Sequence, residues 1–168
     1  LVGSEMCIRD RLKETHKNFY DITGHHILER YGMTETNMNS SNPLDGVRKA
    51  GSVGKPIKDI NIRISATEGS VVSNKNQIGM IEIKGPNVFK GYLNNPKKTQ
   101  EAFTKDGFFI TGDIGYFDND GYLFISGRNK DLIISGGYNV YPKEIEDIIN
   151  QHELVLESAV FGLSLIHI

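Results

Sequence analysis

The segment YGMTE at residues 31–35 carries three side chains that together suit a nucleotide. The ring of Tyr31 offers a flat face on which a base can stack. The hydroxyl of Thr34 can donate to a phosphate, and the carboxylate of Glu35 can bind Mg²⁺, which prefers oxygen ligands and the company of phosphate. Taken alone, the same segment also suits a polar turn capped by Thr34 and Glu35. Both interpretations stay open at this point.

A second candidate is the TGD segment at residues 111–113, which places the carboxylate of Asp113 between two predicted strands. An acidic residue at a strand end accepts hydrogen bonds from ribose hydroxyls in dinucleotide sites. An aspartate in an ordinary turn is the alternative. Neither of the two common glycine-rich phosphate-binding patterns occurs, and the histidines do not have the spacing of zinc ligands.

The elements that would position these residues are mostly strands. Alternation of apolar and polar residues predicts half-buried strands at 60–64 and 80–85. The DNDG segment at 118–121 predicts a hairpin between two of the later strands. The polar segment 37–54 has no periodicity and is predicted to be a long loop. Further strands are predicted at 26–31, 108–111, 114–117, 121–126, 132–134 and 153–161.

Helices are predicted near the N-terminus and at two later places. Residues 13–20 are typical of the exposed end of a helix, and residues 96–103 open with a proline at the first helical position. The last helix starts near Pro142 and carries an apolar stripe formed by Ile145, Ile148 and Ile149. The pattern therefore predicts a mostly antiparallel β region, a boundary near residues 128–130, and the start of a small α+β domain.

The two ends of the chain are predicted to be foreign to the fold. Residues 163–168 (LSLIHI) can be encoded by DNA whose reverse complement encodes residues 6–11, as in a translated sequencing adapter. We therefore assign residues 1–11 and 163–168 to adapter-derived tails and exclude them from the fold predictions. We expect residues 12–162 to be the inside of a longer protein. The exclusion removes Cys7, the one cysteine of the chain.

Composition narrows the class of protein. The 19 basic and 21 acidic residues form no long block of either sign, which argues against a nucleic-acid partner. No apolar run is long enough to cross a membrane. Without Cys7 the chain has neither a disulfide framework nor a cysteine-based metal site. These values are typical of an ordinary globular protein.

Five motifs in a fixed order resemble the adenylate-forming enzymes, a superfamily of acyl-CoA synthetases, luciferases and peptide-synthetase adenylation domains. They are YGMTE, GSVGKP, GMIEIKGPNVFKGY, GFFITGD and GRNKDLIISGGYNVYPKEIE, and the resemblance runs from about residue 29 to residue 162. It implies an α+β fold in which residues 12–128 form the end of a large N-terminal AMP-binding domain. Residues 129–162 would then be a hinge and the start of a small C-terminal domain. ATP, Mg²⁺ and coenzyme A are the small-molecule ligands that it implies.

The resemblance also implies a role for individual residues. The nucleotide would be held by Tyr31 at the adenine with Gly32 beside it, by Thr34 at a phosphate, by Glu35 through Mg²⁺, by Asp113 at the ribose, and by Arg128 at the ribose or a phosphate. Lys130 would be the hinge residue about which the small domain turns, and Gly137 would line the pantetheine tunnel. The phosphate-binding loop and the catalytic lysine of the family lie outside these residues, so the isolated chain is expected to be inactive.

The identity of the acid depends on the polar loop at 37–54 and on Arg48 within it. A guanidinium can hold the second carboxylate of malonate through two parallel hydrogen bonds, whereas a solvated cation paired with Asp45 is the alternative. The loop and the later motifs resemble malonyl-CoA synthetases, which implies malonate or methylmalonate as the acid. A synthetase for another short or medium-chain carboxylate, or a non-catalytic incomplete fragment, remains the alternative. The expected compartment is the bacterial cytoplasm, with the mitochondrial matrix as the alternative.

Overall fold

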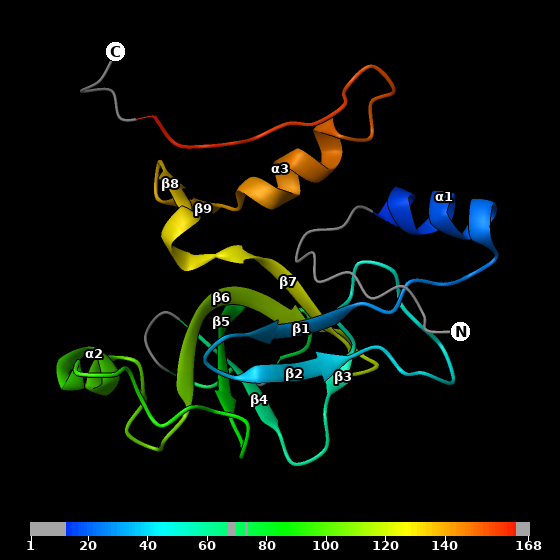
Figure 1. Cartoon of the computed structure of the whole chain (residues 1–168). Helices are drawn as coiled ribbons and strands as arrows, with labels where there is room; N and C mark the ends of the chain where they lie inside the picture. The colour runs from blue at the N-terminus through cyan, green and yellow to red at the C-terminus, as the bar shows by residue number, and fades with distance from the viewer. Residues whose placement is uncertain (1–12, 67–69, 73, 164–168) are drawn as a thin grey trace.

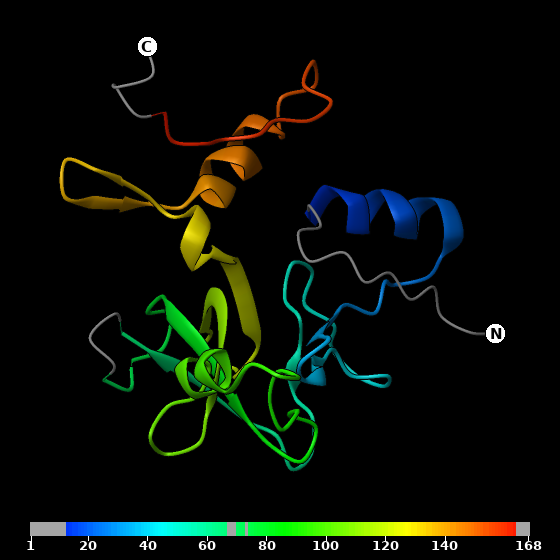
Figure 2. The ribbon, with the colours of Figure 1, turned by 60° about the vertical axis from the view of Figure 1, so that its left-hand side comes forward.

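The structure, a computed structural model, describes residues 13–66, 70–72 and 74–163, with side chains from His16 onward. The predicted tail at 1–11 lies outside these residues, and of the tail at 163–168 only Leu163 is described. Two small antiparallel sheets form the lower body in Figures 1 and 2, and a hairpin, helix α3 and the C-terminal segment lie above them. None of the helices in the described part is long and apolar enough to cross a membrane.

The first sheet contains β1 (Arg30–Met33), β2 (Asn37–Ser41) and β3 (Lys55–Pro56), in that order. The prediction of a loop over 37–54 was therefore wrong for its first five residues, which form β2. Apolar periodicity does not predict this strand, because the residues at its fully buried positions, Asn39 and Ser40, are polar. The hydroxyl of Ser40 donates to the carbonyl of Val53 at 2.8 Å, which satisfies a group that apolar periodicity does not anticipate. The strand predicted at 26–31 begins only at Arg30.

The second sheet has the order β4 (Asn61–Ser65), β5 (Gly79–Lys84), β6 (Phe109–Phe117) and β7 (Leu123–Arg128). The alternating strands near 60–64 and 80–85 are confirmed. The strands predicted separately at 108–111 and 114–117 are one strand, β6, whose register with β7 shifts between Ile114 and Gly115. The hairpin between β6 and β7 is confirmed, and the Asp118 carboxylate accepts the amide of Tyr122 at 2.8 Å in its turn.

The main core lies between the two sheets. Its side chains come from β1, the loop before β3, β4, β5 and β7, and they are Tyr31, Val53, Ile64, Ile81, Ile83 and Leu123. Burying an apolar side chain of this size contributes about 1.5–3 kcal/mol. A separate aromatic cluster of Phe89, Tyr92, Phe103 and Phe109 packs the loop after β5 against the start of β6.

The helices are α1 (Lys13–Thr23), α2 (Pro96–Glu101), the short 3-10 helix η1 (Asn129–Asp131) and α3 (Pro142–Ile149). Helix α2 opens on Pro96, and the side chain of Asn95 caps it by accepting the amide of Lys98 at 3.1 Å. Helix α3 also begins at the predicted proline. Its apolar stripe stays open to solvent, with Ile148 70% exposed.

Strands β8 (Ile133–Ser135) and β9 (Tyr138–Val140) form a hairpin beside α3. Gly136 and Gly137 make its two-residue turn with φ values of 57° and 84°, a conformation that glycine adopts without strain. The strand at 132–134 is confirmed in this hairpin. The strand predicted at 153–161 was wrong: the described residues of this segment pair with no strand, and the Val160 amide instead donates to the Glu146 carboxylate at 2.8 Å.

Candidate functional site

The turn between β1 and β2 presents Thr34 and Glu35 at one edge of the first sheet. The two strands approach so closely that a Cβ atom on Gly32 would lie 2.4 Å from the carbonyl oxygen of Asn37. Gly32 is therefore required by the backbone packing of this turn. The turn closes through a 3.1 Å hydrogen bond from the amide of Thr36 to the carbonyl of Met33.

A cavity of about 550 Å³ lies beside this turn and collects residues from distant parts of the chain. Thr34 and Glu35 line one part of it, and Arg128 and Lys130, at the end of β7 and in η1, line another. Thr111 and Gly112 of β6 complete the wall together with Gly32, Met33 and Asn129. The fold thus brings together five of the predicted site residues, Gly32, Thr34, Glu35, Arg128 and Lys130. We refer to this space as the charged cavity.

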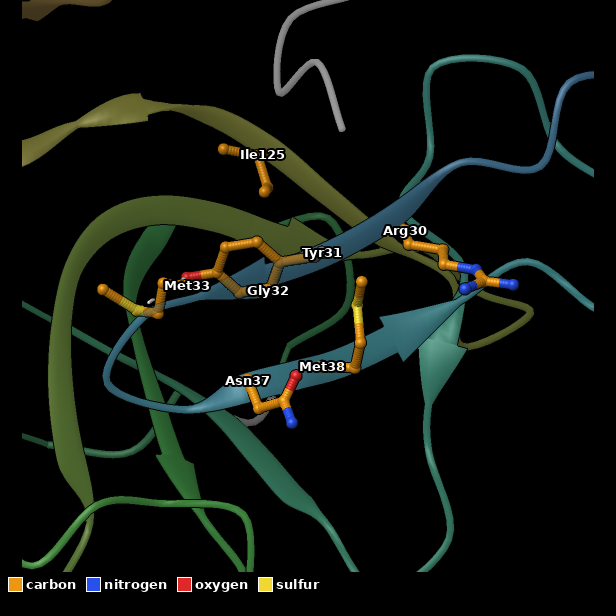
Figure 3. Close-up of a pocket in the computed structure, with 7 residues that line it drawn as sticks. All are labelled: Arg30, Tyr31, Gly32, Met33, Asn37, Met38 and Ile125. Carbon is orange, nitrogen blue, oxygen red and sulfur yellow. Dashed lines mark hydrogen bonds between the residues drawn. The ribbon is translucent and has the colours of Figure 1, made fainter. Parts of the chain in front are cut away.

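A second, more apolar cavity of about 320 Å³ adjoins it and is shown in Figure 3. The ring of Tyr31 and the side chains of Met33, Met38 and Ile125 supply its apolar lining, and Arg30, Gly32 and Asn37 complete it. Gly32 and Met33 line both cavities, so the two spaces border the same stretch of β1. We refer to this second space as the Tyr31 slot. An apolar slot next to a charged cavity matches the two halves of a nucleotide, a base and its phosphates.

Asp113 lines neither cavity and is only 1% exposed, but it contacts a lining residue of each. Its Oδ2 accepts the hydroxyl of Tyr31 at 2.7 Å, and its Oδ1 lies 3.5 Å from Nε of Arg128. The sheet sets up this contact, because Asp113 on β6 is the register partner of Arg128 on β7. The prediction that Asp113 lies between two strands was wrong: it lies within β6, beside a register shift.

Glu35 is half-buried and one of its carboxylate oxygens is fixed. Its Oε1 accepts the hydroxyl of Tyr92 at 3.2 Å, and its carbonyl accepts the amide of Phe89 at 2.8 Å. Burial, followed by the neighbouring Glu35 carboxylate, raises the pKa of Tyr92 above its ordinary value of 10.0, so this hydroxyl keeps its proton and donates.

The residues at the charged cavity fit Mg²⁺ only if the ion brings other ligands. Within the described residues, no group of three or more His, Cys, Asp or Glu side chains could hold a metal ion. Mg²⁺ in phosphate-binding sites is typically held by one or two carboxylates, with phosphate oxygens and water as the remaining ligands. Glu35, which lines the charged cavity, suits that arrangement as the one carboxylate.

Arg48 lies away from these two cavities and lines neither of them. Its guanidinium donates to three backbone carbonyls, those of Pro43 at 3.0 Å, His26 at 2.8 Å and Leu44 at 2.8 Å. These bonds tie the loop after β2 to the segment before β1. The geometry favours the structural alternative for Arg48, with backbone carbonyls as its partners in place of the Asp45 carboxylate.

Two predicted site residues remain, Lys130 and Gly137. Lys130 lies in η1, at the junction between β7 and the C-terminal part of the chain, and Gly137 lies beyond this junction. Lys130 lines the charged cavity and also a second cavity of 390 Å³ between β7, η1 and α3. It therefore borders a cavity on each side of the junction. Gly137 lies in the turn of the β8–β9 hairpin, where a Cβ atom would meet nothing within 4 Å. The structure does not bring Gly137 to either cavity of the candidate site.

Several residues of the site were not predicted from the sequence. Met38 and Ile125 line the Tyr31 slot, and Thr111 lines the charged cavity. Tyr92 and Asn87 hold the Thr34–Thr36 turn from the loop after β5. Both residues belong to the segment GPNVFKGY at 85–92, which entered the sequence predictions only as part of a family motif.

Comparison with known proteins identifies the family. The AMP-binding enzyme family matches residues 6–93, more than half of the chain, and the chain belongs to that family. The match includes residues 6–11, which we assigned to an adapter-derived tail; that assignment stays a prediction.

Individual relatives include several acid–CoA ligases. The chain is 48% identical over 144 residues to a malonate–CoA ligase of Arabidopsis thaliana, covering 85% of this chain and 23% of that protein. It is 38% identical over 151 residues to a long-chain-fatty-acid–CoA ligase of Bacillus subtilis, covering 89% of this chain and 27% of that one. Among solved structures, ATP-bound MatB from Rhodopseudomonas palustris matches with a TM-score of 0.87 and 54% identity, over 90% of this chain and 30% of that chain. The chain therefore spans about a quarter to a third of the length of these relatives.

Proposed function

We propose that this chain is the part of an ATP-dependent acid–CoA ligase that holds the nucleotide during activation of the acid. The observation that carries the proposal is that the Tyr31 slot and the charged cavity share Gly32 and Met33 of β1 as lining residues. The relatives support it, because the malonate–CoA ligase and the fatty-acid–CoA ligase are both named for this type of reaction and the MatB structure has ATP bound.

In this proposal the adenine occupies the Tyr31 slot and the phosphates occupy the charged cavity. Thr34 donates to a phosphate, Glu35 is the protein ligand of Mg²⁺, and Arg128 and Lys130 supply positive charge. The acid carboxylate attacks the α-phosphorus and pyrophosphate leaves, and the thiol of coenzyme A then attacks the acyl carbon and displaces AMP. When bound, Mg²⁺ stabilises the charge that builds up on the phosphate oxygens.

Asp113 is the proposed acceptor for the ribose hydroxyls, although it is nearly inaccessible in this structure. Of its two contacts, Tyr31 approaches at 2.7 Å and Arg128 at 3.5 Å. The Arg128 side chain is 42% exposed, so it has the space to move from Asp113 toward the phosphates. We infer that a ribose hydroxyl takes the place of Arg128 at Oδ1 while Tyr31 keeps Oδ2.

The acid that we propose is malonate or methylmalonate. Support comes from the malonate–CoA ligase relative and from the motifs resembling malonyl-CoA synthetases. The similarity to a long-chain-fatty-acid–CoA ligase keeps other acids as the second candidate. Because a pocket discriminates one methyl group by only about 1–3 kcal/mol, we expect the two dicarboxylates to compete.

The junction at Arg128–Lys130 is the proposed boundary between a large N-terminal domain and a small C-terminal one. The chain narrows there to β7 followed by η1, as Figure 2 shows. Lys130 is 70% exposed and lies next to cavities on both sides of this junction, as expected for a residue about which one domain turns. In the turned arrangement Gly137 would line the passage of the pantetheine.

The experiment that tests the function uses the full-length ligase that carries this chain. Pyrophosphate release from MgATP is measured without coenzyme A in the presence of malonate, methylmalonate, propionate or octanoate, and thioester formation is then measured with coenzyme A. We expect both signals with the two dicarboxylates, and much weaker ones with the monocarboxylates. Pyrophosphate release that no acid stimulates would contradict the ligase, and a preference for octanoate would replace malonate with a medium-chain acid.

A further inference from the structure

We propose that Tyr92 is a positioning residue for Glu35, holding one carboxylate oxygen so that the other faces the charged cavity. The proposal rests on the proposed function, because it assigns Tyr92 a role in metal binding through Glu35. The direct observation is the 3.2 Å hydrogen bond from the Tyr92 hydroxyl to Oε1 of Glu35, between residues 57 positions apart in the sequence.

The Tyr92 ring is itself held from several sides, so its hydroxyl is a fixed donor. The ring packs edge-on against Phe89 with centroids 4.9 Å apart, and the ammonium of Lys98 lies 4.2 Å above its centre. Its backbone amide donates to the Thr99 hydroxyl at 2.9 Å. Phe89 in turn packs edge-on against Phe109, which is 2% exposed, at 5.4 Å.

The backbone of the turn that carries Glu35 is held by the same loop. The Asn87 amide donates to the carbonyl of Thr36 at 2.5 Å and to that of Met38 at 3.2 Å. The amide of Phe89 donates to the carbonyl of Glu35 at 2.8 Å. The loop at 85–92 therefore fixes both the main chain and the side chain of Glu35. Among the described residues of this loop, Tyr92 is the one that hydrogen-bonds to the Glu35 carboxylate.

Fixing one oxygen matters because a carboxylate that rotates freely loses entropy when it binds a metal ion. Groups that hydrogen-bond to metal-ligating side chains orient them, and losing such a group typically costs 10- to 100-fold in metal affinity. The Tyr92 hydroxyl donates to only one of the two Glu35 oxygens, which leaves the other for the ion. We therefore expect Tyr92→Phe to weaken metal binding while the ring contacts remain.

The test measures metal binding directly in the full-length ligase. The enzyme is saturated with a non-hydrolysable ATP analogue, and Mn²⁺ is titrated while free Mn²⁺ is followed by electron paramagnetic resonance. Tyr92→Phe should raise the Mn²⁺ Kd about tenfold or more, and Glu35→Gln should raise it at least as much. Tyr116→Phe is the matched control, because its ring stacks on Phe124 and it does not line the charged cavity, so it should leave the Kd unchanged.

A double-mutant cycle separates positioning from a general structural effect. In the Glu35→Gln background, Tyr92→Phe should change the Mn²⁺ Kd no further, since the carboxylate that it positions is already gone. Two results would overturn the role of Tyr92 and leave the metal role of Glu35 standing. One is an equal loss of Mn²⁺ affinity in both backgrounds, and the other is a wild-type Kd for Tyr92→Phe together with a raised Kd for Glu35→Gln. An unchanged Kd for Glu35→Gln would overturn the metal role of Glu35 and with it the role of Tyr92, whereas the ligase function is tested separately by acid-stimulated pyrophosphate release. Thermal unfolding of each variant verifies that the fold is retained.

Discussion

At the residue scale, the central feature of the candidate site is the buried carboxylate of Asp113, which needs hydrogen-bond donors. Asp113 is 1% exposed and receives a short hydrogen bond from Tyr31, while Arg128 lies at 3.5 Å. Hydrogen bonds to charged groups are worth about 1.5–3 kcal/mol, and those between neutral groups about 0.5–1.5 kcal/mol. The charge of Asp113 therefore matters more to a bound hydroxyl than its shape does.

Asp113→Asn in the full-length ligase should raise the KM for ATP about tenfold, with little change in the KM for the acid. The substitution keeps the shape of the side chain and an acceptor for Tyr31, but it removes the negative charge. Steady-state kinetics with ATP varied at saturating acid checks this. Asp59→Asn is the control, because Asp59 is exposed and its φ of 66° suits asparagine. An unchanged ATP dependence would return Asp113 to a purely structural role.

At the element scale, Lys49 joins the loop after β2 to the β6–β7 hairpin. Nζ of Lys49 lies 2.5 Å from Oδ2 of Asp118 and 2.5 Å from Oδ2 of Asp120, and 4.8 Å from the centre of the Tyr122 ring. The Tyr122 hydroxyl donates to the carbonyl of Val47 at 2.7 Å and so reaches back to the same loop. These contacts join two elements about 70 residues apart in the chain.

The Asp118 carboxylate should make the stability of the chain depend on acid pH. Burial alone would raise the pKa of Asp118, but hydrogen bonds from Lys49 and from backbone amides outweigh it and hold the pKa below its ordinary 3.8. Since the folded state prefers the ionised form, this stabilisation is present above pH 3.8 and is lost as the pH falls toward the folded-state pKa.

Urea unfolding of the purified chain between pH 6 and pH 2.5 measures this dependence. Asp118→Asn cannot titrate, so its unfolding midpoint should fall less steeply below about pH 4 than that of the unsubstituted chain. Other carboxylates titrate in both proteins, and the difference between the two curves isolates Asp118. Parallel curves would show that the contact with Lys49 contributes nothing through charge.

The same loop contains Arg48, and its three carbonyl contacts predict a structural effect. Arg48→Ala should destabilise the purified chain by about 2 kcal/mol, because three carbonyls lose a charged donor that is only partly exposed. Lys58→Ala, at an exposed position, is the control. In the full-length ligase, activity with malonate and with propionate should fall by the same factor. A selective loss of malonate activity would instead show that the guanidinium holds the second carboxylate.

How far the sequence predicts the elements depends on what fills their buried positions. Strands β4 and β5 alternate apolar and polar residues, so their existence could be predicted. Strand β2 could not, because Asn39 and Ser40 take its buried positions and their partners lie in other parts of the chain. The five residues at the charged cavity were found through their motifs, whereas the Tyr92–Glu35 contact crosses 57 positions and required the fold.

At the scale of the whole molecule, many large apolar side chains of the described C-terminal part are exposed. The large side chains of the β8–β9 hairpin, α3 and the following segment are mostly exposed, with Ile134 at 73%, Tyr138 at 78% and Leu156 at 100%. The sheets, in contrast, bury a continuous core. Large apolar side chains that gather in exposed patches are typical of a surface that packs against another part of a protein.

The last prediction concerns the activity of the 168-residue chain by itself. Its two cavities are the proposed sites of the base and phosphates of ATP, while the chain spans only 23% of the malonate–CoA ligase that it resembles. The rest of that ligase has no counterpart in these 168 residues, and positioning of reactants can supply about 7–11 kcal/mol of a catalysed barrier. We therefore expect no detectable thioester from ATP, malonate and coenzyme A with the purified chain, under conditions in which the full-length ligase gives a clear signal by chromatography. Thioester that forms in proportion to the concentration of the chain, and that Glu35→Gln abolishes, would show that these residues alone contain a complete active site.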